Sequence, residues 1–259
     1  MDGATVGIGE TAFAAYLLAL SRTAGFVLIT PPFNTRSVPA RARVGLAVAL
    51  ALPLSATQVA TPTLGSASLY LRALAEAFTG LSLGFFVLLA VAAVQSVGEL
   101  LDVVGGFTMS TAMDPLLMAQ TSVMGRLHQL TAVTLLFASD GHLVVLRGLS
   151  RTMGTAGTAV PNSATMAEAV TTDVAGLFTS AIQIAAPVIA AMLVADVALG
   201  LLTRAAPALN PFALSFPLKI GFTLLLAGLI IARLPQVVHT RVDHAVLTVV
   251  DLVHAAGGG

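Results

Sequence analysis

The chain of 259 residues is 57% hydrophobic and only 9% charged, with 12 Lys and Arg, 12 Asp and Glu, no Cys and no Trp. Because an average soluble domain has about 25% charged residues, this composition excludes a soluble globular protein and indicates an integral membrane protein. The net charge of zero excludes a nucleic-acid binder held by a basic face. The absence of Cys excludes disulfide scaffolds, Cys-ligated metals and thiol catalysis.

Six apolar stretches are long enough to predict membrane helices, and counting six helices is the simplest interpretation. They cover residues 11–30, 44–60, 69–104, 127–149, 170–203 and 212–234. A span needs about 20 mostly apolar residues, so the third and fifth stretches are too long for one straight span. We expect these two to overhang the bilayer or to break into hairpins at Gly or Pro, as at Pro187. Residues 236–259 predict a short amphipathic C-terminal tail on an otherwise single membrane domain, 1–259.

Charged and polar side chains interrupt most of these stretches. On insertion scales a charged group inside the bilayer costs about 2.5–3.5 kcal/mol, so such groups are usually paired or functional. One interpretation is a proton or ion pathway through a transporter, and the other is a set of structural ion pairs between helices. The positions concerned are Arg22, Glu76, Glu99, Asp102, Asp140, His142, Asp173, Asp196 and Lys219.

Glu76, Gly80 and Gly84 recur every four residues, which places them on one face of a helix. The two glycines form a GxxxG pattern, which allows two helix backbones to approach closely. This face fits either an interface with another subunit or packing within the chain.

The segment between the third and fourth stretches is broken at both ends, by Gly105-Gly106 and by Asp114-Pro115. Its middle is nevertheless apolar, and four of the eight Met lie close together at Met109, Met113, Met118 and Met124. Met side chains are flexible and can close around variable shapes. An apolar, non-helical segment at membrane depth either lines a cavity or is buried by protein. A deformable gate in a pore and a loop packed between helices therefore both fit.

The sequence contains no HExxH and no GxxxxGK[ST] motif, and its five His have no metal-ligand spacing. Asp140-Gly141-His142 has no nearby nucleophile that would complete a catalytic triad. We therefore expect no enzyme activity, no catalytic residue, no metal site and no cofactor.

Five blocks of residues, in order along the chain, resemble the FliR/SctT-like export-gate family of type III secretion. The first is Arg22 to Gly25 with Pro31-Pro32-Phe33, Val38-Pro39 and Arg43, and the second is Glu76, Gly80 and Gly84 continuing to Gly98–Asp102. The third is Gly106 to Pro115, and the fourth is Asp140-Gly141-His142. The fifth and most specific is Ala186-Pro187, Asp196, Gly200, Arg204, Pro207, Asn210-Pro211-Phe212, Ser215, Pro217 and Lys219.

The resemblance implies an all-α membrane protein of bent and broken helical hairpins, made of FliP-like and FliQ-like pieces rather than a simple six-span bundle. Family members assemble with FliP-like and FliQ-like gate subunits and with an FlhB-like switch protein. They form the entry pore for unfolded export substrates. The implied place is the bacterial inner membrane at the flagellar basal body, partly raised toward the periplasm.

The resemblance also implies roles for individual residues. The plug that helps to seal the pore would comprise Gly106, Phe107, Met109, Met113, Asp114 and Pro115. Ala112 stands where the family often has an aromatic residue, so the seal would depend more on Met. Contacts with other subunits would involve Arg22, Glu76, Gly80, Gly84, Glu99, Asp102, Asp196, Arg204 and Lys219. A secondary transporter of a small solute or proton, an injectisome subunit and a membrane scaffold without a pore are the alternatives.

Overall fold

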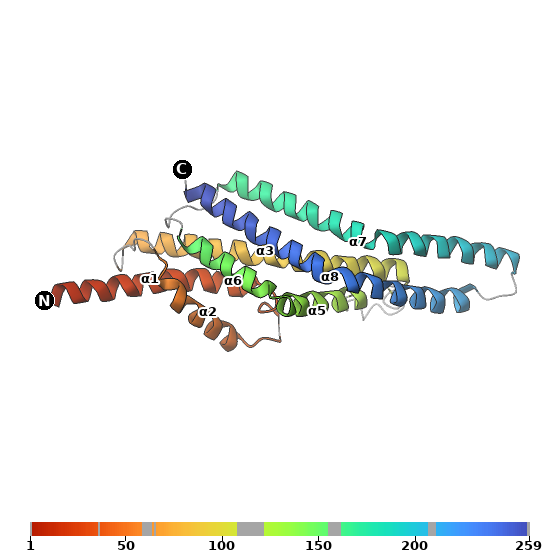
Figure 1. Cartoon of the computed structure of the whole chain (residues 1–259), viewed down its shortest axis with the longest axis horizontal. Coiled ribbons are helices and arrows are strands. Elements are labelled where there is room, and N and C mark those ends of the chain that lie inside the picture. The colour runs from red at the N-terminus through yellow and green to blue at the C-terminus, as the bar shows by residue number, and fades with distance from the viewer. Residues whose placement is uncertain are drawn as a thin grey trace. The chain divides into compact units, whose positions relative to one another are not determined.

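The computed structural model describes residues 2–35, 37–58, 64, 66–107, 122–154, 162–206 and 211–257, with the side chains of 2–8, 211–214 and 257 left aside. These residues form helices joined by short connections, without a strand (Figure 1). In chain order the helices are α1 (Asp2–Ile29), α2 (Ala40–Ser55), α3 (Ala67–Gly105), α5 (Val123–Ala138), α6 (Gly141–Arg151), the 3-10 turn η2 (Thr152–Gly154), α7 (Ser163–Ala205) and α8 (Pro211–Gly257). The predicted all-α class is confirmed.

Among the described residues, four helices are long and apolar enough to cross a membrane. The apolar segments are Gly9–Ile29, Ala67–Gly105, Ser163–Ala205 and Ser215–Ala256. The α5–α6 pair makes a fifth if its two helices, bent at the break between them, count as one span. The simple count of six spans is therefore wrong, whereas the prediction of bent and broken helices is confirmed. The second apolar stretch became α2, whose 16 residues fall short of the ~20 that a span needs.

The helix ends follow from local sequence. Pro31 and Pro32 follow α1 after one residue, Thr30, and their rings prevent its continuation. Gly106 has a φ of 80° at the end of α3, a conformation that costs glycine little. Asp140 has a φ of 57° and separates α5 from α6, which divides the fourth predicted stretch into two helices.

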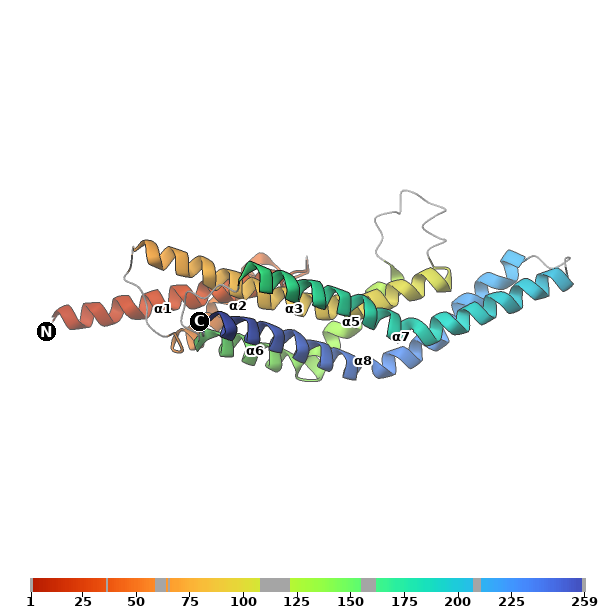
Figure 2. The same ribbon diagram turned by 90° about the horizontal axis from the view of Figure 1, so that it is seen from above.

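The helices α7 and α8 are 43 and 47 residues long, about twice the length that one span requires. Pro187 lies inside α7, and Pro217 and Pro235 lie inside α8. Residues 236–257, the predicted C-terminal tail, are helical and continue α8 without interruption (Figure 2).

The chain forms two compact units. The first comprises Met1–Ala90, Asp140–Asp173 and Thr240–Gly259. Its interior includes two small clusters: Leu69 packs with Ala14 and Leu18, and Met153 packs with Ala19 and Ala51. The many Ala side chains leave little space between the backbones, so the helices of this unit approach one another closely.

The second unit comprises Val91–Ser139 and Val174–His239. It contains the C-terminal part of α3, all of α5, and long parts of α7 and α8. Its fully buried side chains include Leu101 on α3, Met192 on α7 and Leu234 on α8.

Candidate functional site

Three glycines bring α1 and α3 into backbone contact in the first unit. A Cβ atom added to Gly80 would lie 1.9 Å from the carbonyl oxygen of Arg22, and one added to Gly25 would lie 2.4 Å from the carbonyl oxygen of Ala77. At Gly84 the nearest atom would be Thr30 Oγ1, at 2.8 Å. Any side chain at these positions would collide with the opposite helix. The predicted shared face of Glu76, Gly80 and Gly84 therefore lies against α1 of the same chain.

A buried ion pair lies on the same interface. Arg22 Nε on α1 donates to Glu76 Oε2 on α3 at 2.5 Å, and the two side chains are 3% and 2% exposed. Arg22 Nη1 is also buried, and it has no hydrogen-bond partner among the described residues. Burying two charges is costly unless they pair, so this contact holds the two helices at one register. Whether Arg22 and Glu76 also contact another subunit stays a prediction.

In the second unit, Asp102 joins the end of α3 to the start of α5. Both of its carboxylate oxygens accept from the backbone N–H of Met124, at 3.1 and 3.2 Å, and the side chain is 2% exposed. This N–H is one of the unpaired donors at the helix N-terminus, where the helix dipole favours a negative charge. Ser122 caps the same turn by accepting from Gly125 N at 2.7 Å. Asp102 therefore acts as a second cap supplied by a different helix.

Close packing supports this joint. A Cβ atom on Gly98 would lie 2.3 Å from the carbonyl oxygen of Met124. That carbonyl also contacts His128 Nδ1 at 2.8 Å, and the imidazole is fully buried. His128 Nε2 has no partner in the part of the chain that the structure describes. Glu99 is exposed and instead accepts from Gln95 Nε2 at 2.8 Å on its own helix.

The predicted plug begins where α3 ends. Phe107 N donates to Asp102 O at 3.1 Å across Gly106, which closes the helix with a Schellman-type bond. A Cβ atom on Gly105 would lie 2.6 Å from Thr223 Oγ1 of α8. The structure thus describes Gly106 and Phe107 of the plug. Met109, Met113, Asp114 and Pro115 lie outside the described residues.

The α7–α8 hairpin of the second unit carries a second pair of charges. Lys219 Nζ of α8 lies 2.6 Å from Asp196 Oδ1 of α7, and the side chains are 26% and 44% exposed. Arg204 is exposed in the last turn of α7, where a positive charge is favourable to the helix dipole. The predicted subunit contacts of all three residues stay predictions.

Sequence reasoning named Gly25, Gly98 and Met124 without assigning these contacts to them, and it missed Ser122. The Ser122 cap carries a local signal, because Ser directly before a helical run is a typical N-cap. No local pattern identifies the partners of Gly25 and Gly98, because these partners lie on other helices. Among the described residues, no group of three His, Asp or Glu side chains is placed to hold a metal ion.

The comparison with known families places these features in one context. The model of the family "Bacterial export proteins, family 1" matches residues 13–245. This range includes the buried Arg22–Glu76 and Asp102–Met124 contacts, the predicted plug and the Asp196–Lys219 pair.

Individual relatives agree with this match. The chain is 32% identical over 219 residues to the flagellar biosynthetic protein FliR of Bacillus subtilis (strain 168), covering 83% of this chain and 85% of that protein. It is 32% identical over 221 residues to the FliR protein of Escherichia coli (strain K12), covering 82% and 83%. It is 30% identical over 179 residues to the Yop proteins translocation protein T of Yersinia pestis, covering 68% and 67%. The chain therefore belongs to family 1 of the bacterial export proteins, the family that contains the flagellar FliR proteins and their injectisome relatives.

Proposed function

We propose that this chain is a subunit of the flagellar type III export gate in the bacterial inner membrane. In this proposal it lines the entry pore for unfolded export substrates, and residues 106–115 form an apolar plug that seals the pore. The chain conducts passively and catalyses no reaction. The energy for export comes from other parts of the machine.

The observation that carries the plug assignment is the joint between α3 and α5. Asp102, four residues before Gly106, holds Met124, two residues after Ser122. The described residues on the two sides of segment 108–121 are therefore held together by this contact. That segment contains Met109, Met113 and Met118, whose flexible side chains suit a seal that opens for chains of varied shape. A tethered apolar segment of this kind fits a plug better than a rigid linker between helices.

Exposed apolar surface supports an assembled complex. Only 17% of the residues are buried in the most apolar windows of α7 and of α8. Leu193, Val194 and Leu225 are each more than 60% exposed. In the proposed gate this surface is shared between lipid and FliP-like, FliQ-like and FlhB-like subunits, and part of the assembly is raised toward the periplasm.

The flagellar part of the proposal is suggested by the two FliR proteins described above, each 32% identical to this chain over more than four fifths of its length. A deletion strain that lacks this gene is expected to build no flagellar filaments. Filaments in that strain would contradict the flagellar assignment.

The plug is tested by deleting residues 107–113 from the gate as assembled in cells. We expect the assembled complex to leak ions, measured as membrane depolarisation. A deletion of equal length, residues 155–161, is the matched control and is expected to leave permeability unchanged. Unchanged permeability in an assembled 107–113 deletion would overturn the plug assignment. Solute uptake by the chain alone in liposomes would instead support the transporter alternative.

A further inference from the structure

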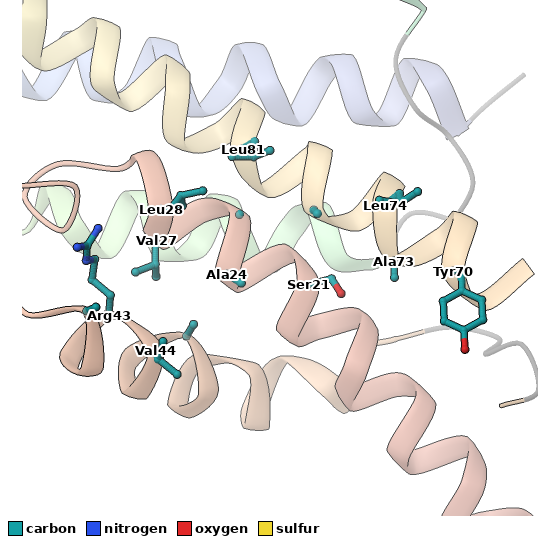
Figure 3. A pocket seen from close by; sticks show the side chains of 14 residues that line it. Ser21, Ala24, Val27, Leu28, Arg43, Val44, Tyr70, Ala73, Leu74 and Leu81 are labelled. Carbon is teal, nitrogen blue, oxygen red and sulfur yellow. The ribbon is translucent and has the colours of Figure 1, made fainter. Parts of the chain in front are cut away.

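A groove in the first unit lies between α1, α2 and α3, beside the contact of Gly25 with Ala77 (Figure 3). Its volume is about 780 Å³, within the usual range for small-ligand sites. Small side chains such as Ala24, Ala73 and Ala77 leave the space open, and larger apolar side chains such as Leu28 and Leu74 line it. Arg43 lies at one end and Tyr70 at the other.

Arg43 is the polar feature of this groove. Its Nε atom is buried and has no hydrogen-bond partner among the described residues. An unpaired buried donor on a charged group is costly, so a missing partner of opposite charge is indicated. Arg43 also lies in the first turn of α2, where no acidic residue is present and the N-cap Pro39 makes no side-chain hydrogen bond. The helix dipole adds to the attraction for an anion there.

The surrounding sequence supplies no such anion. Residues 11–75 contain five Arg and not one Asp or Glu. Glu76, the next acid, is already paired with Arg22. No acid within residues 11–75 can therefore serve as the counter-ion of Arg43.

The lining of the groove favours one kind of occupant. From Tyr70 to Leu81, α3 extends about 16 Å, which is close to half of the ~30 Å hydrocarbon core of a bilayer. An extended hydrocarbon chain can lie along apolar walls of that length. A phospholipid carries such a chain together with a phosphate, so it matches both the apolar walls and the unpaired Nε of Arg43.

We propose that this groove binds one acyl chain of an anionic phospholipid, with the lipid phosphate at Arg43. A guanidinium group can make two parallel hydrogen bonds to a phosphate, which would satisfy the buried Nε. The acyl chain packs against the apolar walls of the groove instead of among the lipids of the bilayer. The bound lipid completes the surface between α1, α2 and α3.

The two tyrosines of the chain allow a direct test. The protein has no Trp, and Tyr16 and Tyr70 are its only Tyr. In a Tyr16→Phe background, Tyr70 becomes the sole emitter; it lines the groove and is 65% exposed. The full chain is reconstituted in phosphatidylcholine vesicles that contain increasing fractions of spin-labelled phosphatidylglycerol or spin-labelled phosphatidylcholine. Quenching of Tyr70 fluorescence then reports the relative binding constants of the two lipids.

We expect the labelled phosphatidylglycerol to bind about fivefold more tightly than labelled phosphatidylcholine. Arg43→Gln should reduce this ratio to about one, and Arg43→Lys, which keeps the charge, should retain most of it. Arg233→Gln, which removes an exposed charge on α8, is the matched control and should leave the ratio unchanged. Ala24→Leu should fill the groove and weaken quenching by both lipids. Far-UV circular dichroism checks that each variant keeps its helical content.

Equal binding of the two lipids in the Tyr16→Phe protein would overturn the proposal. An unchanged preference for phosphatidylglycerol over phosphatidylcholine in Arg43→Gln would also overturn it. An equal loss of this preference in Arg233→Gln would do the same. Unchanged quenching in Ala24→Leu would show that no acyl chain occupies the groove and would also overturn the proposal. The assay uses the chain without its partners, so its outcome is independent of the proposed export function.

Discussion

The α1–α3 interface of the first unit and the α7–α8 hairpin of the second unit both combine glycines with a pair of opposite charges. In the first, Gly25, Gly80 and Gly84 touch the opposite helix, and the Arg22–Glu76 pair is at most 3% exposed. In the second, Gly200, Gly221 and Gly228 have open space around them, and the Asp196–Lys219 pair is 26–44% exposed. The same residue types therefore serve internal packing in one region and remain available to neighbours in the other.

The two regions should therefore differ in how much they contribute to the stability of the isolated folded chain. A buried charge that loses its partner is strongly destabilising, whereas an exposed pair contributes little. We therefore expect substitutions in the α1–α3 interface to lower the stability of the isolated chain. Equivalent substitutions in the α7–α8 hairpin should act mainly on assembly.

The largest effect is expected for Glu76→Leu, which leaves the Arg22 guanidinium buried without its counter-ion. The free energy of unfolding should fall by about 3–5 kcal/mol, measured by SDS titration in mixed micelles. The double variant Arg22→Met/Glu76→Leu removes both charges and should recover most of the loss. Equal stability of Glu76→Leu and the unmodified chain would show that the pair does not hold α1 on α3.

The next effect is expected for Gly80→Ala, because its Cβ would overlap the carbonyl oxygen of Arg22. Separating the two backbones should cost about 1–3 kcal/mol in the same titration. Gly228→Ala on α8 is the matched control. With nothing within 4 Å of the new methyl group, it should be neutral or stabilise the isolated chain by up to about 1 kcal/mol. If Gly80→Ala and Gly228→Ala changed the free energy of unfolding equally, the two regions would not differ in how closely their helices pack.

An intermediate effect is expected for Asp102→Ala, which removes the carboxylate that caps α5. The Met124 N–H then stays buried without its acceptor, and the expected loss is about 1–2 kcal/mol. Asp102→Asn keeps one acceptor oxygen and should lose less. If the two variants lose the same amount, the negative charge rather than the hydrogen bond is what matters at this joint.

The smallest effect on the isolated chain is expected for Asp196→Asn. Its partner Lys219 is partly exposed, so the loss should stay below about 1 kcal/mol. The matched change in the buried region is Glu76→Gln, which should cost more in the same titration. If Asp196→Asn lowered the free energy of unfolding as much as Glu76→Gln, the ion pair of the hairpin would stabilise the isolated chain as strongly as the buried pair does.

The sequence pattern predicted part of this contrast. The four-residue spacing of Glu76, Gly80 and Gly84 placed them on one face of a helix, and the structure agrees. The spacing did not identify Arg22 as the partner, because the two residues are 54 positions apart and the pairing depends on how the helices fold together. For the same reason the Asp102–Met124 and Asp196–Lys219 contacts were not predicted.

Hydropathy predicted where apolar helices lie but not how many spans they make. The second stretch ends early because α2 stops at Ser55, and the fourth is interrupted at Asp140 by a left-handed backbone conformation. Both events depend on one or two residues, which an average over about 20 residues does not resolve.

The Arg22–Glu76 pair has a consequence for the synthesis of the protein. Glu76 is translated 54 residues after Arg22, which at about 5–20 residues per second is a delay of about 3–11 s. During that interval an inserted α1 would carry an uncompensated charge, at a cost of about 2.5–3.5 kcal/mol. Pairing with Glu76 offsets that cost once α3 has been made, so α1 depends on a residue that is synthesised after all of α2.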